Sequence, residues 1–381
     1  MWRLAEDTLS QDEINDLADW LRKGERLTQG ERVKAFERAW STWLGCADSV
    51  FVGSGTTANF ALMACAAEKV DREVPRVGVA AVTWSTNVSP SLLLGHEVVV
   101  FDVDPQTLGV DEAAVCASMD AGELDILFVT HLLGLNALTQ NILDAAERNG
   151  VILLEDCCES HGVTFSDAKA GTFGMGGTFS FYFGHHMSTI EGGMISTDDT
   201  AFADRLRLMR AHGLARESAR FDAYAAENPN VDPRFLFVAT GLNFRSTELN
   251  AFLGIPQLEK LDERVAIRNR NMNLFLQGVP DWLRSDYRTE GMSSFALPLI
   301  ARDAEGAAKA RAVADRLEIE SRPVVAGNLM THPFMQSGKV RVHGDGLPHA
   351  EAIDAYGLYL GNGHHVSEAQ VEQLTQALRE A

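Results

Sequence analysis

Residues 49–70 read SVFVGSGTTANFALMACAAEKV and join two patterns that together decide the class of fold. SVFVG is a short, continuous apolar run of the kind found in buried strands. SGTTA then supplies a glycine turn with hydroxyl-bearing caps, and ANFALMACAAEKV continues as an apolar helix. A buried strand that passes through a glycine turn into a helix is the repeating unit of an α/β protein with a parallel sheet.

The same alternation continues to about residue 200. Further strand candidates lie at 77–82, 97–103, 126–132, 151–156, 177–183 and 193–198. Nearly all-apolar strands of this kind predict a mostly parallel sheet with helices on both faces. Beyond residue 200 the pattern changes to long helices and then to mixed helices and strands. We therefore expect a large domain over 1–250, a smaller α+β domain over 251–381, and a loop at 216–235.

Composition excludes several classes of protein. The 381 residues are 46% hydrophobic and 23% charged, which is typical of a globular chain and not of a disordered or fibrous one. The net charge of −20 repels nucleic acid and anionic membranes, so we expect neither as a partner. The five cysteines are odd in number and two are adjacent, which favours a reducing compartment and a cytoplasmic location.

The first candidate site is the glycine turn Gly53-Ser54-Gly55-Thr56, which joins a strand to a helix. Glycines let the backbone approach an anion, and the first N–H groups of a helix have no intrahelical partner. The hydroxyls add donors, so the turn can hold a phosphate without a lysine. An ordinary strand-to-helix turn with a threonine cap has the same sequence, and these residues alone leave both interpretations open.

Two further candidates stand at strand ends, where an open parallel sheet binds its ligands. Asp156 follows the apolar run of VILLED, so its carboxylate is partly desolvated and needs a cationic partner. A protonated cofactor ring would serve, and so would a structural salt bridge. Trp84 follows another strand, and its ring either stacks on a flat ligand or belongs to the core.

His185 and His186 form the next candidate, within SFYFGHHMSTIEGG. Adjacent residues of an extended chain point to opposite sides, so these two imidazoles would not chelate one ion together. A zinc site that also uses His161 lacks a third ligand at helical or hairpin spacing. We therefore expect no metal here, and a structural role for the histidine pair competes with a catalytic one.

Taken in order, SGTTAN, VTW, LLEDCCES, SFYFGHH, RAHG and GLNFR are far more specific than any one of these segments. Their order resembles the sugar aminotransferase family of pyridoxal-phosphate enzymes over nearly the whole chain. The resemblance implies an α/β fold of the aspartate-aminotransferase type and a cofactor that is pyridoxal 5′-phosphate (PLP) or pyridoxamine 5′-phosphate. It also implies a homodimer with shared active sites.

The resemblance further implies which positions hold the cofactor, and these are Gly55, Thr56, Trp84, Asp156, Glu159, Ser180 and Asn243. In this scheme Trp84 stacks on the pyridine ring and Asp156 pairs with the protonated ring nitrogen. Asn243 is implied to reach the phosphate of the neighbouring subunit's cofactor. His212 and Arg245 are implied to contact the sugar nucleotide or the carboxylate of the amino donor.

The usual family pattern, S-F-x-x-x-K-N, contains the lysine that binds the cofactor covalently, and His185 stands at that position here. An imidazole cannot keep that bond, but it can carry protons near neutral pH. A branch of the family shares this histidine and comprises sugar 3-dehydratases. The resemblance to that branch implies a noncovalent cofactor, His185 as the catalytic proton carrier, and L-glutamate as amino donor. It also implies a GDP-linked 4-keto-6-deoxymannose that loses its 3-hydroxyl with release of ammonia.

Three alternatives remain beside this one. The chain could be an aminotransferase, or a dehydratase of another nucleotide sugar, because no residue of the sequence identifies the base of the nucleotide. A non-catalytic PLP-binding regulator also fits the lost lysine, although the other pocket residues are retained. By contrast, a second histidine branch is rejected: it carries an iron–sulfur cluster and needs cysteines in the second half of the chain, where none follows Cys158.

Overall fold

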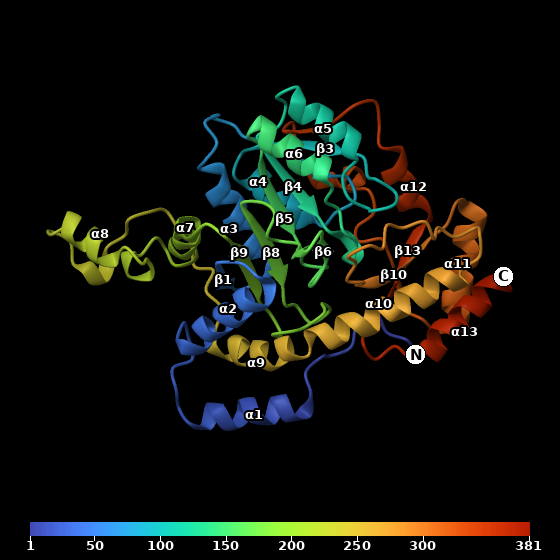
Figure 1. Cartoon of the computed structure of the whole chain (residues 1–381), viewed down its shortest axis with the longest axis horizontal. Coiled ribbons are helices and arrows are strands. Elements are labelled where there is room, and N and C mark those ends of the chain that lie inside the picture. Colours follow the sequence, from blue (N-terminus) through green and yellow to red (C-terminus); the bar gives the residue numbers. More distant parts are fainter.

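An eight-stranded sheet forms the centre of the computed structural model, which describes residues 1–381 (Figure 1). Its members are β1 (Asp48–Val52), β2 (Arg76–Ala80), β3 (Glu97–Phe101), β4 (Ile126–Thr130), β5 (Ile152–Asp156), β8 (Gly176–Ser180), β9 (Gly193–Thr197) and β12 (Val340–Val342). The order across the sheet is β1-β9-β8-β5-β4-β2-β3-β12, and only β9 runs antiparallel to its neighbours. The expected mostly parallel sheet is confirmed.

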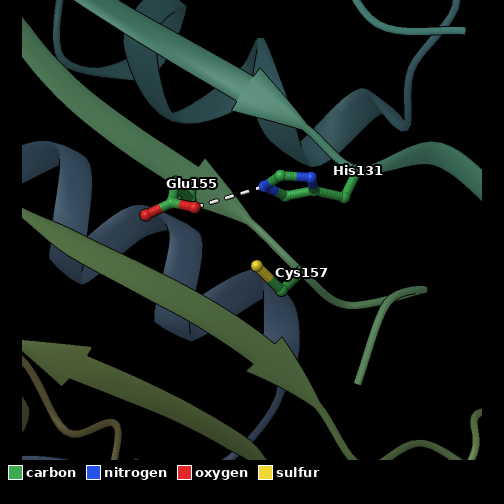
Figure 2. Close-up of side chains that lie close together, drawn as sticks. All are labelled: His131, Glu155 and Cys157. Atoms are coloured by element: carbon green, nitrogen blue, oxygen red, sulfur yellow. Dashed lines mark hydrogen bonds and ion pairs between the residues drawn. The ribbon is translucent and has the colours of Figure 1, made fainter. Parts of the chain in front are cut away.

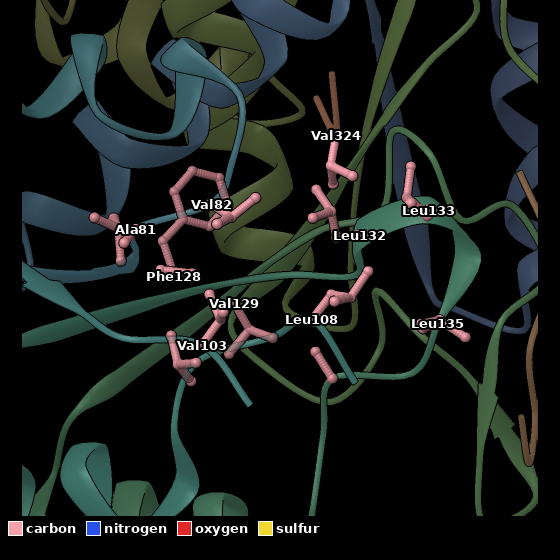
Figure 3. Close-up of a cluster of buried hydrophobic side chains, with 14 of the residues drawn as sticks. Ala81, Val82, Val103, Leu108, Phe128, Val129, Leu132, Leu133, Leu135 and Val324 are labelled. Atoms are coloured by element: carbon pink, nitrogen blue, oxygen red, sulfur yellow. The ribbon is translucent and has the colours of Figure 1, made fainter. Parts of the chain in front are cut away.

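Helices cover both faces of this sheet because its strands are apolar on both sides. They are α2 (Glu31–Leu44), α3 (Gly55–Ala67), α4 (Ser89–Leu93), α5 (Glu112–Asp120), α6 (Gln140–Asn149) and α7 (Thr200–Arg210). α2, α3 and α7 pack against the β1–β9–β8 half, and α4 and α6 contact β3 and β5. Figure 3 shows part of the resulting core, in which Val82, Phe128 and Val129 are fully buried.

The second half of the chain begins with two consecutive helices, α9 (Glu248–Glu259) and α10 (Leu261–Gly278). A three-stranded antiparallel sheet follows, in the order β10-β13-β11, from β10 (Ala296–Ile300), β11 (Ser321–Pro323) and β13 (Gly357–Gly361). Its helices are α11 (Ala304–Arg316), α12 (Pro348–Tyr356) and α13 (Glu368–Arg379). This is an α+β unit, as the sequence predicts for the C-terminal part.

Two segments cross the expected division at residue 250, which itself stays a prediction. β12 comes from the C-terminal part but pairs in parallel with β3 of the large sheet. At the other end of the chain, Trp2 pairs with Ile319, and its indole nitrogen donates to the Gly361 carbonyl at 2.9 Å. The N-terminal residues that precede α1 (Gln11–Arg22) therefore lie against the small sheet.

The prediction of a loop at 216–235 was wrong in one respect, because this segment contains the short helix α8 (Phe221–Glu227). α8 lies at the end of an arm that projects from the body of the molecule (Figure 1, left). A short hairpin, β6 (Thr164–Phe165) with β7 (Ala168–Lys169), completes the elements near the site. None of the helices combines the length and apolar character needed to cross a membrane.

Candidate active site

The glycine turn after β1 has the geometry of an anion site. Ser54 caps α3 in a reciprocal box, in which the Thr57 N–H donates to Ser54 Oγ at 3.2 Å and the Ser54 N–H donates to Thr57 Oγ1 at 2.9 Å. A Cβ at position 55 would lie 2.7 Å from Ser180 Cβ, so only glycine fits. The N–H groups of Gly55 and Thr56 precede the intrahelical ladder and are free to bind an anion.

Asp156 ends β5 as a buried carboxylate without a cation. Its Oδ2 accepts hydrogen bonds from the side-chain amides of Asn59 and Asn87, both at 2.9 Å. Its Oδ1 accepts from the Cys158 N–H at 2.9 Å, so all three of the donors that contact it are uncharged amides. Removing one partner of a buried ion pair leaves a costly charge, so this site fits a ligand that brings its own positive charge.

Trp84 is not part of the core, because 54% of its surface is exposed. It precedes the short helix η1 (Ser85–Asn87), whose Asn87 holds Asp156. The indole is therefore an open aromatic face, and it lines the same cavity as Asp156. An exposed ring of this size at a strand end suits stacking on a planar ligand.

One cavity of about 430 Å³ brings most of the predicted residues together. Its lining includes Gly55, Thr56, Trp84, Asp156, Glu159, Ser180 and His185. Asn243, His212 and Arg245 do not line it. Their segment runs beside β1, where the Gly53 N–H donates to the Phe244 carbonyl at 2.9 Å, and both Asn243 and His212 are exposed. The roles given to these residues stay predictions.

Glu159 has a pKa close to neutral pH. Burial raises its pKa to about 7, the Leu133 N–H that donates to its Oε2 at 3.0 Å lowers it, and the nearby Asp156 charge raises it further. Both protonation states are therefore populated at neutral pH. Because a protonated carboxyl donates a hydrogen bond and an ionised one only accepts, Glu159 offers the cavity either function.

His185 lies in the passage that follows β8 and is half-buried. Burial, together with the positive charge of Arg268, lowers its pKa to about 4, so the imidazole is neutral under physiological conditions. Nδ1 is buried without a hydrogen-bond partner, Nε2 is not among the buried atoms that lack one, and the residue lines the cavity. His186 is fully buried, with Nε2 3.2 Å from the Ser293 carbonyl oxygen. The two side chains thus have different surroundings.

The far wall of the cavity comes from segments that the sequence did not assign. These residues are Leu4, Ala5, Phe295, Ala296, Glu320, Arg322, Tyr359 and Gly361. Leu4 N–H donates to Glu320 Oε2 at 3.0 Å, which ties the N-terminal segment to β11. The only signal for this wall is the SRPVVAGN stretch, which contributes to the family resemblance and contains Arg322.

A second buried cluster, His131, Glu155 and Cys157, has ligand atoms within 4.8 Å of one another (Figure 2). The Glu155 carboxylate accepts from three backbone N–H groups of the turn after β7, those of Gly171, Phe173 and Gly174. His131 Nδ1 accepts from the Ala137 N–H, so Nε2 carries the proton and donates to Glu155 at 3.2 Å. These hydrogen bonds indicate that the cluster stabilises the turn after β7 and the segment that follows β4.

The alternative zinc group of His161, His185 and His186 is not brought together in the same way. The rings of His161 and His186 have centroids 5.3 Å apart, and those of His161 and His185 are 6.2 Å apart. Their nitrogens do not converge within the 4.8 Å that unites the other cluster. The geometry gives no support to that alternative.

The fold and the cavity together define a protein of the PLP-dependent aminotransferase type. Residues 7–379 match the DegT/DnrJ/EryC1/StrS aminotransferase family, and the chain belongs to that family. Over 387 aligned residues, which are 99% of this chain and 98% of the relative, it is 32% identical to GDP-4-keto-6-deoxy-D-mannose 3-dehydratase of Yersinia pseudotuberculosis. The expected family is confirmed.

Solved structures extend this similarity to three dimensions. The E. coli GDP-4-keto-6-deoxy-D-mannose-3-dehydratase with bound hydrated PLP has a TM-score of 0.92 at 30% identity and 99% coverage of both chains. A GDP-4-keto-6-deoxymannose-3-dehydratase with a trapped PLP–glutamate geminal diamine has a TM-score of 0.89 at 29% identity, and covers 99% of this chain and 100% of that one. The expected aspartate-aminotransferase-type fold is confirmed.

Proposed function

We propose that this chain is a PLP-dependent C3 dehydratase of a nucleotide-linked 4-keto-6-deoxyhexose, with GDP-4-keto-6-deoxy-D-mannose as substrate. The observation that carries this proposal is a neutral histidine, His185, in the same cavity as the unpaired carboxylate of Asp156 and the anion-binding turn at Gly55. The full-length similarity to dehydratases of this substrate supports it.

The cavity fits the cofactor by its donor set. The N–H groups of Gly55 and Thr56 and the Ser180 hydroxyl would hold the phosphate, and Trp84 would cover the ring. Asp156 would pair with the ring nitrogen and keep it protonated. Bound in this way, the cofactor supplies an electron sink for negative charge that develops on the attached substrate.

No lysine lines the cavity, so these contacts would hold the cofactor without a covalent tether. In the related aminotransferases a lysine both tethers the cofactor and moves protons. Here the two tasks are separated: Asp156 and the glycine turn bind the cofactor, and His185 transfers the protons. Noncovalent binding makes the cofactor's affinity depend wholly on the binding residues.

His185 performs the proton transfers because it is a neutral imidazole that lines the cavity. It removes a proton from carbon, and it returns a proton to the 3-hydroxyl oxygen as the C–O bond breaks. The hydroxyl would leave as water. The nitrogen that glutamate supplied would be released as ammonia when a water molecule replaces it on the sugar and restores the 4-keto group. Glu159, with its pKa raised to about 7, can hold the departing or attacking oxygen by a hydrogen bond.

L-glutamate is the amino donor in this proposal, and the dehydratase with a trapped PLP–glutamate adduct supports that choice. We also propose a cytoplasmic homodimer. The five cysteines are all free, which suits a reducing compartment. Asn243 and His212 are exposed outside the cavity of their own chain, which supports their action, with Arg245, at the cavity of a second subunit.

The test is turnover with defined products. The protein is incubated with PLP, L-glutamate and GDP-4-keto-6-deoxymannose, and ammonia and the sugar are measured. Ammonia released in step with loss of the 3-hydroxyl supports the proposal, and the His185→Asn variant should release none. A stable 4-amino sugar would make the protein an aminotransferase, and cofactor binding without turnover would make it a regulator. Thermal stabilisation by UDP or CDP in place of GDP would assign the substrate to that nucleotide instead.

A further inference from the structure

His185 separates the large cavity from a second, much smaller one. Both cavities have Leu4, Ala5, Gly184 and His185 in their walls. The small cavity measures about 10 Å³, and its remaining wall comes from the turn after β13, from Glu6 and Thr8 of the N-terminal segment, and from Arg268 of α10. A space of about 10–15 Å³ holds one water molecule when enough polar groups surround it.

The walls of the small cavity carry an unusual number of polar atoms without partners. Four of its residues each have a buried nitrogen that no group of the chain hydrogen-bonds: His185 Nδ1, Arg268 Nε, His364 Nδ1 and His365 Nε2. The hydroxyl of Thr8 in the same wall is also buried without a partner, and the Glu6 carboxylate completes the polar lining. Each such atom costs about 1–3 kcal/mol if it stays unsatisfied. Unpartnered atoms on several residues that line one water-sized space point to a shared partner that occupies it.

A single water can satisfy the four unpartnered nitrogens of this wall. Arg268 Nε–H can only donate, and His185 donates from Nδ1 when Nε2 is free to accept a proton in the large cavity. The neutral rings of His364 and His365 can each accept at the unpartnered nitrogen. A water molecule has two acceptor and two donor sites, which matches two donors and two acceptors. Burial lowers the pKa of both His364 and His365, and that of His364 falls to about 4, which favours these neutral forms.

We propose that the small cavity holds an ordered water which accepts the Nδ1–H of His185, and that His364 and His365 act through this water as positioning residues for the proton carrier. This inference rests on the proposed function only where it concerns proton transfer; the water itself does not depend on it.

The consequence is a fixed tautomer. Beside Arg268, which has no acceptor, a proton on His185 Nδ1 is stable only if the water takes its hydrogen bond. Without that water the proton moves to Nε2, and the nitrogen that faces the large cavity can no longer accept one. The small cavity thus decides which nitrogen of His185 serves as the base, in the way that a hydrogen bond to one imidazole nitrogen sets the state of the other.

The test compares two double variants in the PLP-loaded protein. His364→Leu with His365→Leu removes both acceptors, whereas His364→Gln with His365→Gln keeps a side-chain oxygen at each position. Nitrogen-15 NMR of the histidine rings reads the tautomer, and the His185→Asn variant assigns the signal. We expect the proton on Nδ1 in the wild type and in the Gln pair, and on Nε2 in the Leu pair. His349→Gln, far from both cavities, should leave the signal unchanged.

A second measurement follows proton transfer without the sugar. Exchange of the glutamate α-hydrogen with deuterated solvent should slow about tenfold in the Leu pair, the change that one lost hydrogen bond produces, with an unchanged KM for glutamate. The Gln pair should restore most of the rate. If the Leu pair does not fold, the single variant His365→Leu takes its place in both measurements.

The outcomes separate this inference from the proposed function. An unchanged tautomer and exchange rate in the Leu variants would overturn the inference, as would a high-resolution crystal structure with a dry small cavity. If the tautomer responds as expected but no sugar is dehydrated, the inference about the water stands and the proposed function fails.

Discussion

Replacing Asp156 by Asn tests how a cofactor without a covalent tether is held. The change keeps the shape of the side chain but removes its charge. In the wild type the carboxylate accepts three hydrogen bonds, from Asn59, Asn87 and the Cys158 N–H. An amide can keep only those bonds that reach its oxygen, so one buried donor loses its acceptor at a cost of about 1–3 kcal/mol.

That cost to the cofactor-free protein is offset, because the variant no longer buries an unpaired charge. The cofactor-bound protein has no such compensation. Leaving a cationic ring nitrogen without its buried partner costs about 3–5 kcal/mol. Since a tenfold change corresponds to about 1.4 kcal/mol, PLP should bind about two to four orders of magnitude more weakly to the Asp156→Asn protein.

The assay is a fluorescence titration of PLP into cofactor-free protein, with thermal unfolding measured alongside. Asp125→Asn is the matched control. Asp125 also accepts a backbone hydrogen bond, from the Arg76 N–H at 2.8 Å, but it lies before the first residue of β4, whereas Asp156 is the last residue of β5. It should leave the PLP dissociation constant unchanged. Binding to Asp156→Asn within about threefold of the wild type would refute a charge pair as the main anchor.

Three further changes have definite expected outcomes. Gly55→Ala places a Cβ 2.7 Å from Ser180 Cβ, so it should destabilise the fold by about 1–3 kcal/mol in urea unfolding and weaken phosphate binding. Glu159→Gln should remove a pH dependence of the unfolding free energy. In the wild type the folded pKa of Glu159 is raised from 4.5 to about 7. The protonated group therefore stabilises the fold below pH 4.5, and this stabilisation is lost as pH rises through 7. Arg210→Ala strips the partner from buried Glu37, 2.6 Å away, and should cost about 3–5 kcal/mol of unfolding free energy.

Two of these changes have a matched control variant. Gly338→Ala meets no atom within 4 Å and should be neutral. Arg22→Ala breaks only the exposed pair with Asp19 and should change stability by less than about 1 kcal/mol. For Glu159→Gln, the unfolding free energy of the wild type should fall relative to that of the variant as pH rises from 4.5 to about 7; parallel curves would contradict a raised pKa.

The sequence predicted the elements whose signals are local. The apolar run before Asp156 and the glycine turn at Gly55 each fix a strand end within a few residues. Ser10 and Glu13 form the capping box that their spacing predicts for the first helix. These features depend on neighbours in the chain, so their residue types suffice to place them.

Elements that depend on distant partners were less accessible. β12 is only Val340–Val342, and it becomes a strand because it pairs with β3, some 240 residues earlier. The far wall of the cavity, with Arg322 and Tyr359, is assembled in the same way by the approach of the small sheet. The small cavity behind His185 has no sequence signal, because Arg268 and His365 come from separate segments.

The most direct test of the central claim, that a histidine has replaced the tethering lysine, is borohydride reduction of the PLP-loaded protein followed by intact mass measurement. The wild type should keep the mass of the bare chain, whereas the His185→Lys variant should gain one reduced cofactor. A wild-type chain that gains the cofactor covalently on any of its lysines would contradict the claim.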